Sequence, residues 1–519
     1  MKFNKKILPP HQNVTGVSPL MSGREPKRHC SSVADANPWC GGLLAICFLA
    51  AVLFVGFAAG VFPLVFLLAA GALLLAVFFS FYTQAAFYLL VAYLPFQVAL
   101  NVSGDIDLLS GRLLILLLFL VWILKNFKER KPFWQKNQAV LILFFIIAVI
   151  SVLAAQNQGW AIRKILVFAS IFPLFFIVAG LVGTREQLKK VFWMVAGSAL
   201  AAGLIAFCQF LAQFVFGREA VFNFWSQRVA SLFYGQAFGQ AVVQNPSWLV
   251  EIGGQPLMRA IGLFPDPHML AFYLGMVSPL ILALAFMEKK YRIFLFVVFG
   301  FLLAVLLLTF SRGGYLGLAG SIAIMTIFSW RQLGHKAKIF ISSLFFVAAV
   351  LIVLAGAPIA DRFFSSFDLA EGSNSSRIKI WGEALNQAKQ NILLGVGLGN
   401  YPLSLNFNEK YRSAVTSHNL YLDILVETGI FGLLAWLWFL GGAARAVLKE
   451  TKRAALAAPA LGVLGALIYF AVHSFFETAI FNPTILAFFM IITGLAANLE
   501  KIRINSKSQI PNKLQSPKL

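Results

Sequence analysis

The chain contains little charge and little cysteine. Only 12% of its 519 residues are Asp, Glu, Lys or Arg, whereas a soluble globular protein averages about 25%. So few charges cannot cover a protein of this size for water, which excludes a soluble enzyme. The 4 Cys residues show no metal-ligand spacing, so we expect neither a disulfide nor a metal site. The sequence also lacks a P-loop, an HExxH motif and a Gly-x-Ser-x-Gly motif, the usual signatures of nucleotide-binding proteins, metalloproteases and α/β-hydrolases.

Hydrophobic residues make up 60% of the chain and come in long runs. Runs of about 18 or more apolar residues are long enough to cross the hydrocarbon core of a bilayer. We count fourteen runs, at about 41–60, 61–80, 83–102, 108–126, 138–155, 160–182, 188–216, 266–287, 291–310, 314–330, 338–357, 419–444, 457–475 and 482–499. The first two are separated only near Gly60 and Pro63, so twelve or thirteen spans are alternatives. The sequence therefore predicts an all-α, polytopic transmembrane helical bundle of about 12–14 spans, with a partly helical large outer loop.

The net charge of +22 could indicate a nucleic-acid partner, but its distribution argues against one. Most Lys and Arg residues lie in short loops between the apolar runs and in the two tails. Short cytoplasmic loops carry this excess in membrane proteins. We therefore expect a lipid bilayer as the environment, no nucleic acid as a partner, and both termini in the cytoplasm.

The apolar runs and the charges together divide the chain into successive segments. We expect a disordered cytoplasmic tail at 1–40, N-terminal transmembrane helices at 41–216, an outer loop at 217–265, transmembrane helices at 266–357, a large extracytoplasmic loop at 358–418, C-terminal transmembrane helices at 419–499 and a cytoplasmic tail at 500–519.

The large outer loop carries a helical pattern of its own. Ser373, Asn374 and Ser375 offer capping oxygens before a predicted helix at 377–390. Ile378, Trp381, Leu385 and Ala388 repeat at helical spacing on one face of this helix. The pattern predicts an amphipathic helix on or above the membrane, with Arg377 near its start.

Several cations lie where the orientation rule does not expect them. Arg112, Arg163, Lys164 and Arg312 lie toward the outer ends of predicted spans, and Arg377 lies in the outer loop. A cation at the centre of a span costs about 2.5–3.5 kcal/mol, so it usually has a partner or a function. An anion held at the outer leaflet would explain this group, because the arginine fork suits phosphate. The alternative is that each side chain extends to the lipid head groups.

Arg312 stands out from the other four cations. It lies in Ser311-Arg312-Gly313-Gly314, a short break between two predicted spans. The glycines allow backbone N–H groups to approach a ligand. A tight turn that happens to contain an arginine is the alternative.

His418 opens a predicted span at its outer end and is the candidate base. A neutral imidazole can accept a proton from a hydroxyl near neutral pH, although a histidine at this place can also be a helix cap. Glu427, nine positions later, falls on the opposite helix face and is expected to contact a neighbouring span. Gly429 and Gly432 predict a face of close helix approach.

Two other histidines open or close predicted spans on the outer side. His268 follows Pro265-Asp266-Pro267, a pattern typical of a helix start with Asp266 as its cap, so a structural role is favoured there. His473 lies at the end of the thirteenth run with Glu477 just beyond it. We expect that both of these residues could line the same cavity.

Two further motifs are weak. Residues 395–400 read Gly-Val-Gly-Leu-Gly-Asn, which has the wrong spacing for a nucleotide loop and predicts a turn after the amphipathic helix. Asp105-Ile106-Asp107 has the DxD spacing by which some glycosyltransferases hold a metal. A single DxD at the mouth of a span is often only solvated.

Three ordered stretches across residues 260–440 resemble the O-antigen ligase/O-antigen polymerase superfamily of bacterial membrane glycosyltransferases. They are Ser311-Arg312-Gly313-Gly314-Tyr315-Leu316-Gly317, Arg377-Ile378 with Trp381 continuing to 395–400, and His418-Asn419 followed by Tyr421-Leu422, Glu427-Thr428-Gly429 and Gly432. The N-terminal spans resemble the family only as generic apolar helices. His268 departs from the resemblance, since relatives more often have Asn at that place.

The resemblance implies a metal-independent, inverting glycosyltransferase without a cofactor in the bacterial inner (cytoplasmic) membrane. Its donor would be a glycan on undecaprenyl diphosphate, and its acceptor a hydroxyl of a glycan, a lipid or a protein at the extracytoplasmic face. Arg312 and Arg377 would hold the diphosphate, and His418 would act as the base. Arg112, Arg163, Lys164, His268, Tyr421 and Glu427 are the further candidates for substrate binding.

Two questions stay open at this point. The sequence does not separate a ligase from a polymerase, although a polymerase or a capsule or exopolysaccharide role is slightly favoured. The alternative function is a transporter or flippase of a lipid-linked glycan. A transporter would place charges along a path through the midplane, often in repeated halves, whereas these cations gather at one face and no internal repeat is evident.

Overall fold

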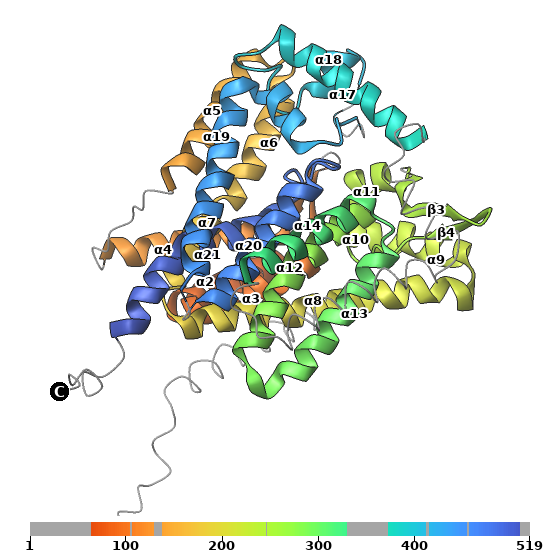
Figure 1. Cartoon of the computed structure of the whole chain (residues 1–519). Coiled ribbons are helices and arrows are strands. Elements are labelled where there is room, and N and C mark those ends of the chain that lie inside the picture. Colours follow the sequence, from red (N-terminus) through yellow and green to blue (C-terminus); the bar gives the residue numbers. More distant parts are fainter. Residues whose placement is uncertain are drawn as a thin grey trace, which may run out of the picture. The chain divides into compact units, whose positions relative to one another are not determined.

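The computed structural model describes residues 64–103, 106–128, 138–244, 246–329, 372–409, 411, 415–453 and 456–508. It consists of two compact units, Met1–Leu74 and Leu75–Leu519. Of the first unit only the beginning of helix α2 (Leu64–Phe81) is described. The second unit is a bundle of helices with two short antiparallel hairpins (Figure 1). The predicted all-α polytopic fold is therefore confirmed.

Among the described residues, seven helices are long and apolar enough to cross a membrane. They are Ser110–Lys128, Gln158–Leu181, Arg185–Phe216, Pro267–Met287, Lys289–Leu308, Leu420–Thr451 and Pro483–Asn505. The pair Gly71–Phe81 and Thr83–Phe96, bent by 118°, would make an eighth, and Gln138–Ala154 and Ala457–His473 are shorter apolar helices. The predicted runs at 41–60 and 338–357 lie outside the described residues.

The described residues from Thr83 to Phe216 form six helices and one hairpin. The helices are α3 (Thr83–Tyr93), α4 (Ser110–Lys128), α5 (Gln138–Ser151), α6 (Gln158–Ile171), α7 (Pro173–Leu181) and α8 (Arg185–Phe216), with 3₁₀ turns at Leu94–Phe96 and Val152–Ala154. The hairpin pairs β1 (Ala99–Ser103) with β2 (Ile106–Leu109). The run predicted as a span at 83–102 thus leaves the helix after Phe96, because Pro95 cannot continue it.

The segment at 217–265, predicted as an outer loop, is folded. It contains α9 (Arg218–Phe224), a π-helical turn (Trp225–Val229), α10 (Ala230–Tyr234), α11 (Gln236–Val243), a 3₁₀ turn (Pro246–Trp248) and a hairpin of β3 (Leu249–Ile252) and β4 (Gln255–Met258). Figure 1 shows these elements gathered at one side of the bundle. Tyr234, Trp248 and Ile261 belong to its separate apolar core.

Three helices form the tightly packed centre of the second unit. They are α12 (Pro267–Met287), α14 (Arg312–Ser329) and α20 (Ala457–His473), flanked by α13 (Arg292–Leu308), with a 3₁₀ turn at Lys289–Tyr291, and α21 (Pro483–Ser508). A Cβ atom on Gly275 would lie 1.8 Å from the Tyr469 ring, so glycine is required where α12 meets α20. Tyr469 also donates its hydroxyl to Ala271 O at 2.7 Å. This packing brings the N-termini of α12 and α14 beside the C-terminus of α20.

Helix α19 (Leu420–Thr451) is interrupted rather than continuous. Gly429 has φ +70°, and Ile430 N donates to Ile392 O at 2.8 Å instead of to its own helix. A Cβ atom on Gly429 would lie 2.1 Å from Leu393 O. The break at Gly429 therefore lets the 391–400 turn pack against the helix backbone. The sequence predicted instead that Gly429 would contact a neighbouring helix.

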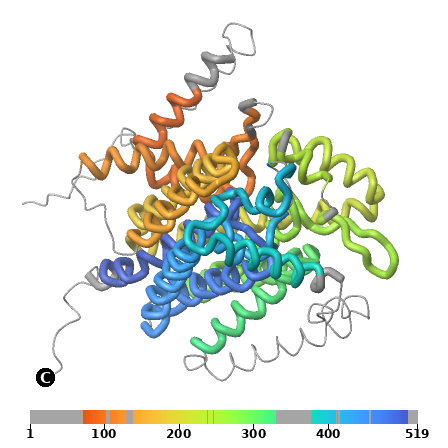
Figure 2. The backbone as a smooth tube through the Cα atoms, turned by 90° about the horizontal axis from the view of Figure 1, so that it is seen from above, coloured from red at the N-terminus to blue at the C-terminus, as the bar shows by residue number. Residues whose placement is uncertain are grey.

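The outer helix forms, but it begins earlier than predicted and buries only part of the predicted face. Helix α17 (Gly372–Gln390) already contains Ser373–Ser375, so the predicted cap there is wrong. Ala384 and Ala388 are buried against Val426 of α19, whereas Ile378 and Leu385 are 48% and 42% exposed. Figures 1 and 2 show α17 and the short α18 (Tyr401–Leu405) lying over the end of α19.

The turn predicted at 395–400 is confirmed, and its glycines have a physical reason. Gly395, Gly397 and Gly399 have φ values of +71°, +91° and +75°, which favour glycine. A Cβ atom on any of them would lie less than 3 Å from the backbone at Glu427, from Ala155 or from Lys164, respectively. The alternating glycines therefore let this turn pack directly against α19, against α6 and against the residue after the 3₁₀ turn at Val152–Ala154.

Candidate active site

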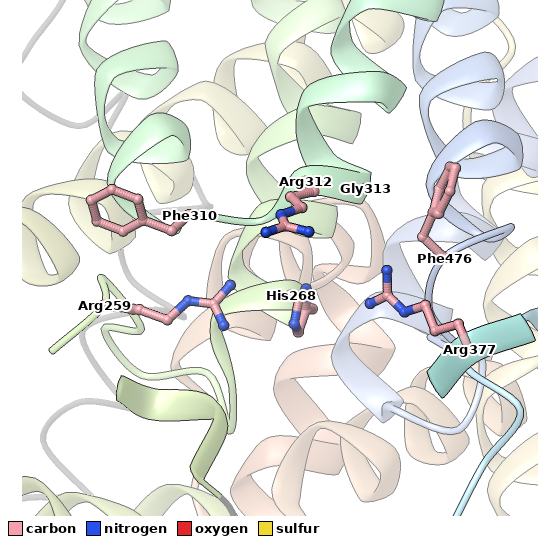
Figure 3. A pocket seen from close by; sticks show the side chains of 7 residues that line it. All are labelled: Arg259, His268, Phe310, Arg312, Gly313, Arg377 and Phe476. Atoms are coloured by element: carbon pink, nitrogen blue, oxygen red, sulfur yellow. The ribbon is translucent and has the colours of Figure 1, made fainter. Parts of the chain in front are cut away.

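Three arginines converge on one open cavity. Its volume is about 530 Å³ when the open space at its entrance is included. The cavity is lined by Arg259, His268, Phe310, Arg312, Gly313, Arg377 and Phe476. Figure 3 shows the three guanidinium groups around His268, with Arg259 to its left, Arg312 above it and Arg377 to its right. The sequence predicted Arg312 and Arg377, which the structure brings into the same cavity. It did not predict Arg259.

Arg312 is the first residue of α14, and the turn before it is strained. Phe310 has φ +49°, a value that a bulky residue adopts only where its surroundings enforce it. Ser311 caps the N-terminus of this helix, since its carbonyl accepts from Tyr315 N and its Oγ accepts from Gly314 N. A helix N-terminus carries a partial positive charge. The strained turn therefore directs both Arg312 and a helix N-terminus at the cavity.

Arg259 is held rigidly at the rim where the folded segment at 217–265 meets α13. Its side chain is buried, donating from Nε to Thr309 O at 2.7 Å and from Nη1 to Ser247 O at 3.0 Å. These carbonyls fix the guanidinium plane without neutralising its charge. A cation among apolar residues just before a predicted span was the available sequence signal.

Arg377 reaches the cavity from the second turn of α17. One turn later, Trp381 donates Nε1 to Ser417 O at 3.0 Å. Ser417 directly precedes His418, so α17 is tied to the turn that carries the candidate base. Arg377 is close enough to His418 for its charge to lower the pKa of that imidazole.

His418 is held in an unusual backbone conformation against Glu477. Its φ is +51°, in the left-handed region. Its Nδ1 lies 3.1 Å from Glu477 Oε2. With Nδ1–H donating to the carboxylate, Nε2 of the neutral ring is the atom that can accept a proton. His418 is not among the residues lining the cavity, although Phe476, the neighbour of Glu477, is.

A buried carboxylate links the two segments that carry this pair. Asp423 accepts from Ser417 N at 2.9 Å through Oδ1, and from the Thr478 hydroxyl through Oδ2. Leu420 N also donates to Ser474 O at 2.9 Å. The turn before α19 and the loop after α20 are therefore joined on both sides of the His418–Glu477 pair.

The pair shifts the ionisation of both of its members. The negative charge of Glu477 raises the pKa of His418, against the opposing effects of burial and of Arg377. Burial by itself would raise the pKa of Glu477, but the charge and hydrogen bond of His418 outweigh it and lower that pKa. The two groups thus stabilise each other's charged forms.

The other predicted substrate ligands have partners within the protein and do not line the cavity. Arg112 donates to Ser170 Oγ at 2.8 Å, Lys164 pairs with Glu427 at 3.1 Å, Arg163 lies 4.8 Å from the Tyr411 ring centre, and Tyr421 donates to Ala471 O at 2.8 Å. The predicted contact of Glu427 with a neighbouring span is confirmed, because Lys164 belongs to α6.

The DxD motif is only partly described, since residue 105 lies outside the described residues. Both oxygens of Asp107 accept backbone N–H groups, from Gln236 and Phe238, each at 3.1 Å. Asp107 therefore caps the N-terminus of α11. No cluster of three or more His, Cys, Asp or Glu side chains suited to a metal occurs within the described ranges.

A sequence comparison assigns part of the chain to a family. Residues 295–437 match the family model of the O-antigen ligases. The resemblance predicted from the motifs is therefore confirmed over about a quarter of the chain. The O-antigen ligase region contains Arg312, Arg377 and His418, whereas Arg259, His268 and Glu477 lie outside it. No curated protein matches the chain. The protein is thus a multi-pass membrane protein that carries an O-antigen ligase-type region.

Proposed function

We propose that this protein is a glycosyltransferase of the O-antigen ligase/polymerase type. It transfers or polymerises a glycan from undecaprenyl diphosphate onto an acceptor hydroxyl at the extracytoplasmic face of the inner membrane. The observation that carries this proposal is the convergence of three guanidinium groups on one cavity, one of which, that of Arg377, also acts on a histidine whose Nδ1 is bound to a carboxylate. A diphosphate needs the first feature and a hydroxyl nucleophile needs the second.

The step proceeds as a single displacement. Nε2 of His418 takes the proton of the acceptor hydroxyl while its oxygen attacks the anomeric carbon. The bond from that carbon to the diphosphate oxygen breaks, and the electron pair leaves on the diphosphate. Attack from the face opposite the leaving group inverts the anomeric configuration. Arg259, Arg312 and Arg377 stabilise the negative charge that grows on the leaving diphosphate.

Reconstitution tests the proposal directly. The purified protein in proteoliposomes is supplied with an undecaprenyl diphosphate-linked glycan and with glycan, lipid or protein acceptors. We expect a glycosylated acceptor of inverted configuration and free undecaprenyl diphosphate, at a rate that EDTA leaves unchanged, because the arginines supply the charge stabilisation. Movement of intact donor across the bilayer without bond cleavage would contradict the proposal in favour of a flippase. A strict metal requirement would instead favour Asp105 and Asp107 as metal ligands.

The acidic limb of the pH profile should depend on Glu477. Transfer requires the neutral imidazole, so the rate should rise with pH as His418 loses its proton. Glu477 raises the pKa of His418, and Glu477→Gln keeps an oxygen for Nδ1–H while removing the charge. We expect this variant to shift the acidic limb of kcat to lower pH. Glu219→Gln, an exposed change, is the matched control and should leave the limb in place. A limb that stays unmoved in Glu477→Gln would contradict the role of the pair.

A further inference from the structure

Two buried imidazoles share one hydroxyl beside the arginine cavity. His268 Nδ1 lies 2.9 Å from Ser311 Oγ, and His473 Nε2 lies 3.3 Å from the same oxygen. Ser311 Oγ also accepts from Gly314 N at 3.3 Å. Ser311 and His473 are completely buried. His268 lines the cavity among the three arginines (Figure 3).

The number of hydrogens restricts how these groups can bond. A serine hydroxyl has one hydrogen and two lone pairs. Gly314 N–H occupies one lone pair of Ser311, so the hydroxyl can accept from one imidazole and donate to the other. Two imidazoles that both donated would bring three N–H groups to two lone pairs. The cluster therefore fits one donating and one accepting ring nitrogen.

The surroundings of His473 decide which imidazole donates. Its ring stacks on Phe272 with centroids 3.7 Å apart and an interplanar angle of 6°, which fixes its plane. Its Nδ1 is buried and has no hydrogen-bond partner in the described part of the chain. Because an orphaned buried N–H is rarer than an orphaned acceptor, the proton of His473 lies on Nε2 and is donated to Ser311. The Ser311 hydroxyl then donates to His268 Nδ1.

We propose that Ser311 and His473 fix the tautomer of His268, which presents Nε2–H to the cavity as a neutral donor for a diphosphate oxygen of the glycan donor. This inference rests on the proposed function for the identity of the ligand. In the opposite tautomer the ring would direct a lone pair at the phosphate oxygen and repel it. His268 thus adds a directional hydrogen bond without a fourth positive charge. Ser311 and His473 are positioning residues in this arrangement.

A pair of His473 variants isolates the hydrogen bond from the packing. His473→Phe keeps the ring stacked on Phe272 and removes only the donor at Nε2. His473→Gln restores an amide donor at a similar reach. Ser311 itself is unsuitable, because its loss would also remove the bond from Gly314 N that begins α14.

The first measurement reads the tautomer without any substrate. Protein labelled with ¹⁵N-histidine in nanodiscs is studied by NMR, and the His268 signals are assigned by their loss in His268→Asn. We expect His268 to be neutral and protonated on Nε2 in the wild type, to populate both tautomers in His473→Phe, and to return to Nε2 in His473→Gln. Wild-type His268 protonated on Nδ1, or a tautomer unchanged in His473→Phe, would overturn the inference.

The second measurement titrates undecaprenyl diphosphate as the probe. We expect binding about three- to tenfold weaker in His473→Phe, as for the loss of one neutral hydrogen bond, and binding within about twofold of wild type in His473→Gln. Equal affinity in His473→Phe and wild type would overturn the role in binding. Failure of glycan transfer by the wild type would overturn the proposed function but leave the tautomer result standing, so the two failures are distinguishable.

Discussion

His418→Asn is expected to lower kcat for glycan transfer by about 10²–10⁴-fold, the usual contribution of a positioned base. Asparagine is the informative replacement because residue 418 has φ +51°, a conformation that asparagine adopts more readily than alanine. The backbone turn between Ser417 and Asn419 is thereby retained while the base is lost. The measurement is steady-state transfer by nanodisc-embedded protein, with full-length protein and thermal stability checked in parallel.

His418→Ala separates the loss of the base from strain at this turn. It should lose transfer to the same extent as His418→Asn but be less stable than that variant, because asparagine adopts a left-handed backbone more readily than alanine. Activity near that of the wild type in His418→Asn would remove His418 as the base. His268, the histidine that lines the cavity, would then be the alternative.

The site owes its geometry to chain ends that meet from distant parts of the sequence. Arg259 precedes α12, Arg312 begins α14 and Glu477 follows α20. Tight glycine contacts fix the positions of these helices relative to one another. Examples are Gly275 against Tyr469 and Gly314 against Ala271. Such contacts leave little freedom for the cavity walls to relax, which suits a site that must be preorganised for charge.

The sequence was sufficient to predict the fold class and part of the site. Hydropathy defines the helices because a bilayer demands long apolar runs. Arg312 and Arg377 could be predicted because a cation near a predicted outer helix end is unusual. The N-terminal cap of α12 at Asp266 could be predicted from local chemistry, and its Oδ1 indeed accepts from Met269 N at 2.9 Å.

The remainder of the site depends on pairings that no local pattern reveals. The same rule that selected Arg312 also selected Lys164, whose partner Glu427 lies 263 positions away. A cation can be satisfied by a ligand or by a carboxylate, and the spacing of residues does not distinguish the two. Arg259 has no local signature for a related reason, because its anchor Thr309 O is supplied by the distant C-terminus of α13. The sequence predicts a helix-packing role for Gly429. Its actual role, a positive φ that makes room for the 391–400 turn, depends on contacts with a segment earlier in the chain.

Arg312→Ala is expected to lower kcat/KM by about 10²–10³-fold, comparable to the loss of one donor that stabilises a developing anion. Negative charge on the diphosphate increases as the anomeric bond breaks, so the loss should appear in kcat as well as in KM. Arg312→Lys keeps the charge but not the planar fork and should recover only part of the activity. Arg312 is the best of the three arginines to test, because Arg259 also holds Thr309 O and Ser247 O and its loss would disturb the fold.

The matched control for this prediction is Arg228→Ala, which removes an exposed arginine from the π-helical turn after α9. If general positive charge near the membrane surface were sufficient to hold the donor, Arg228→Ala and Arg312→Ala would weaken transfer to similar, small extents, and both losses would diminish with added salt. If the guanidinium at the start of α14 acts on the leaving diphosphate, only Arg312→Ala should lose turnover. That loss should persist at saturating donor, because a contact that strengthens as the bond breaks cannot be replaced by a higher donor concentration.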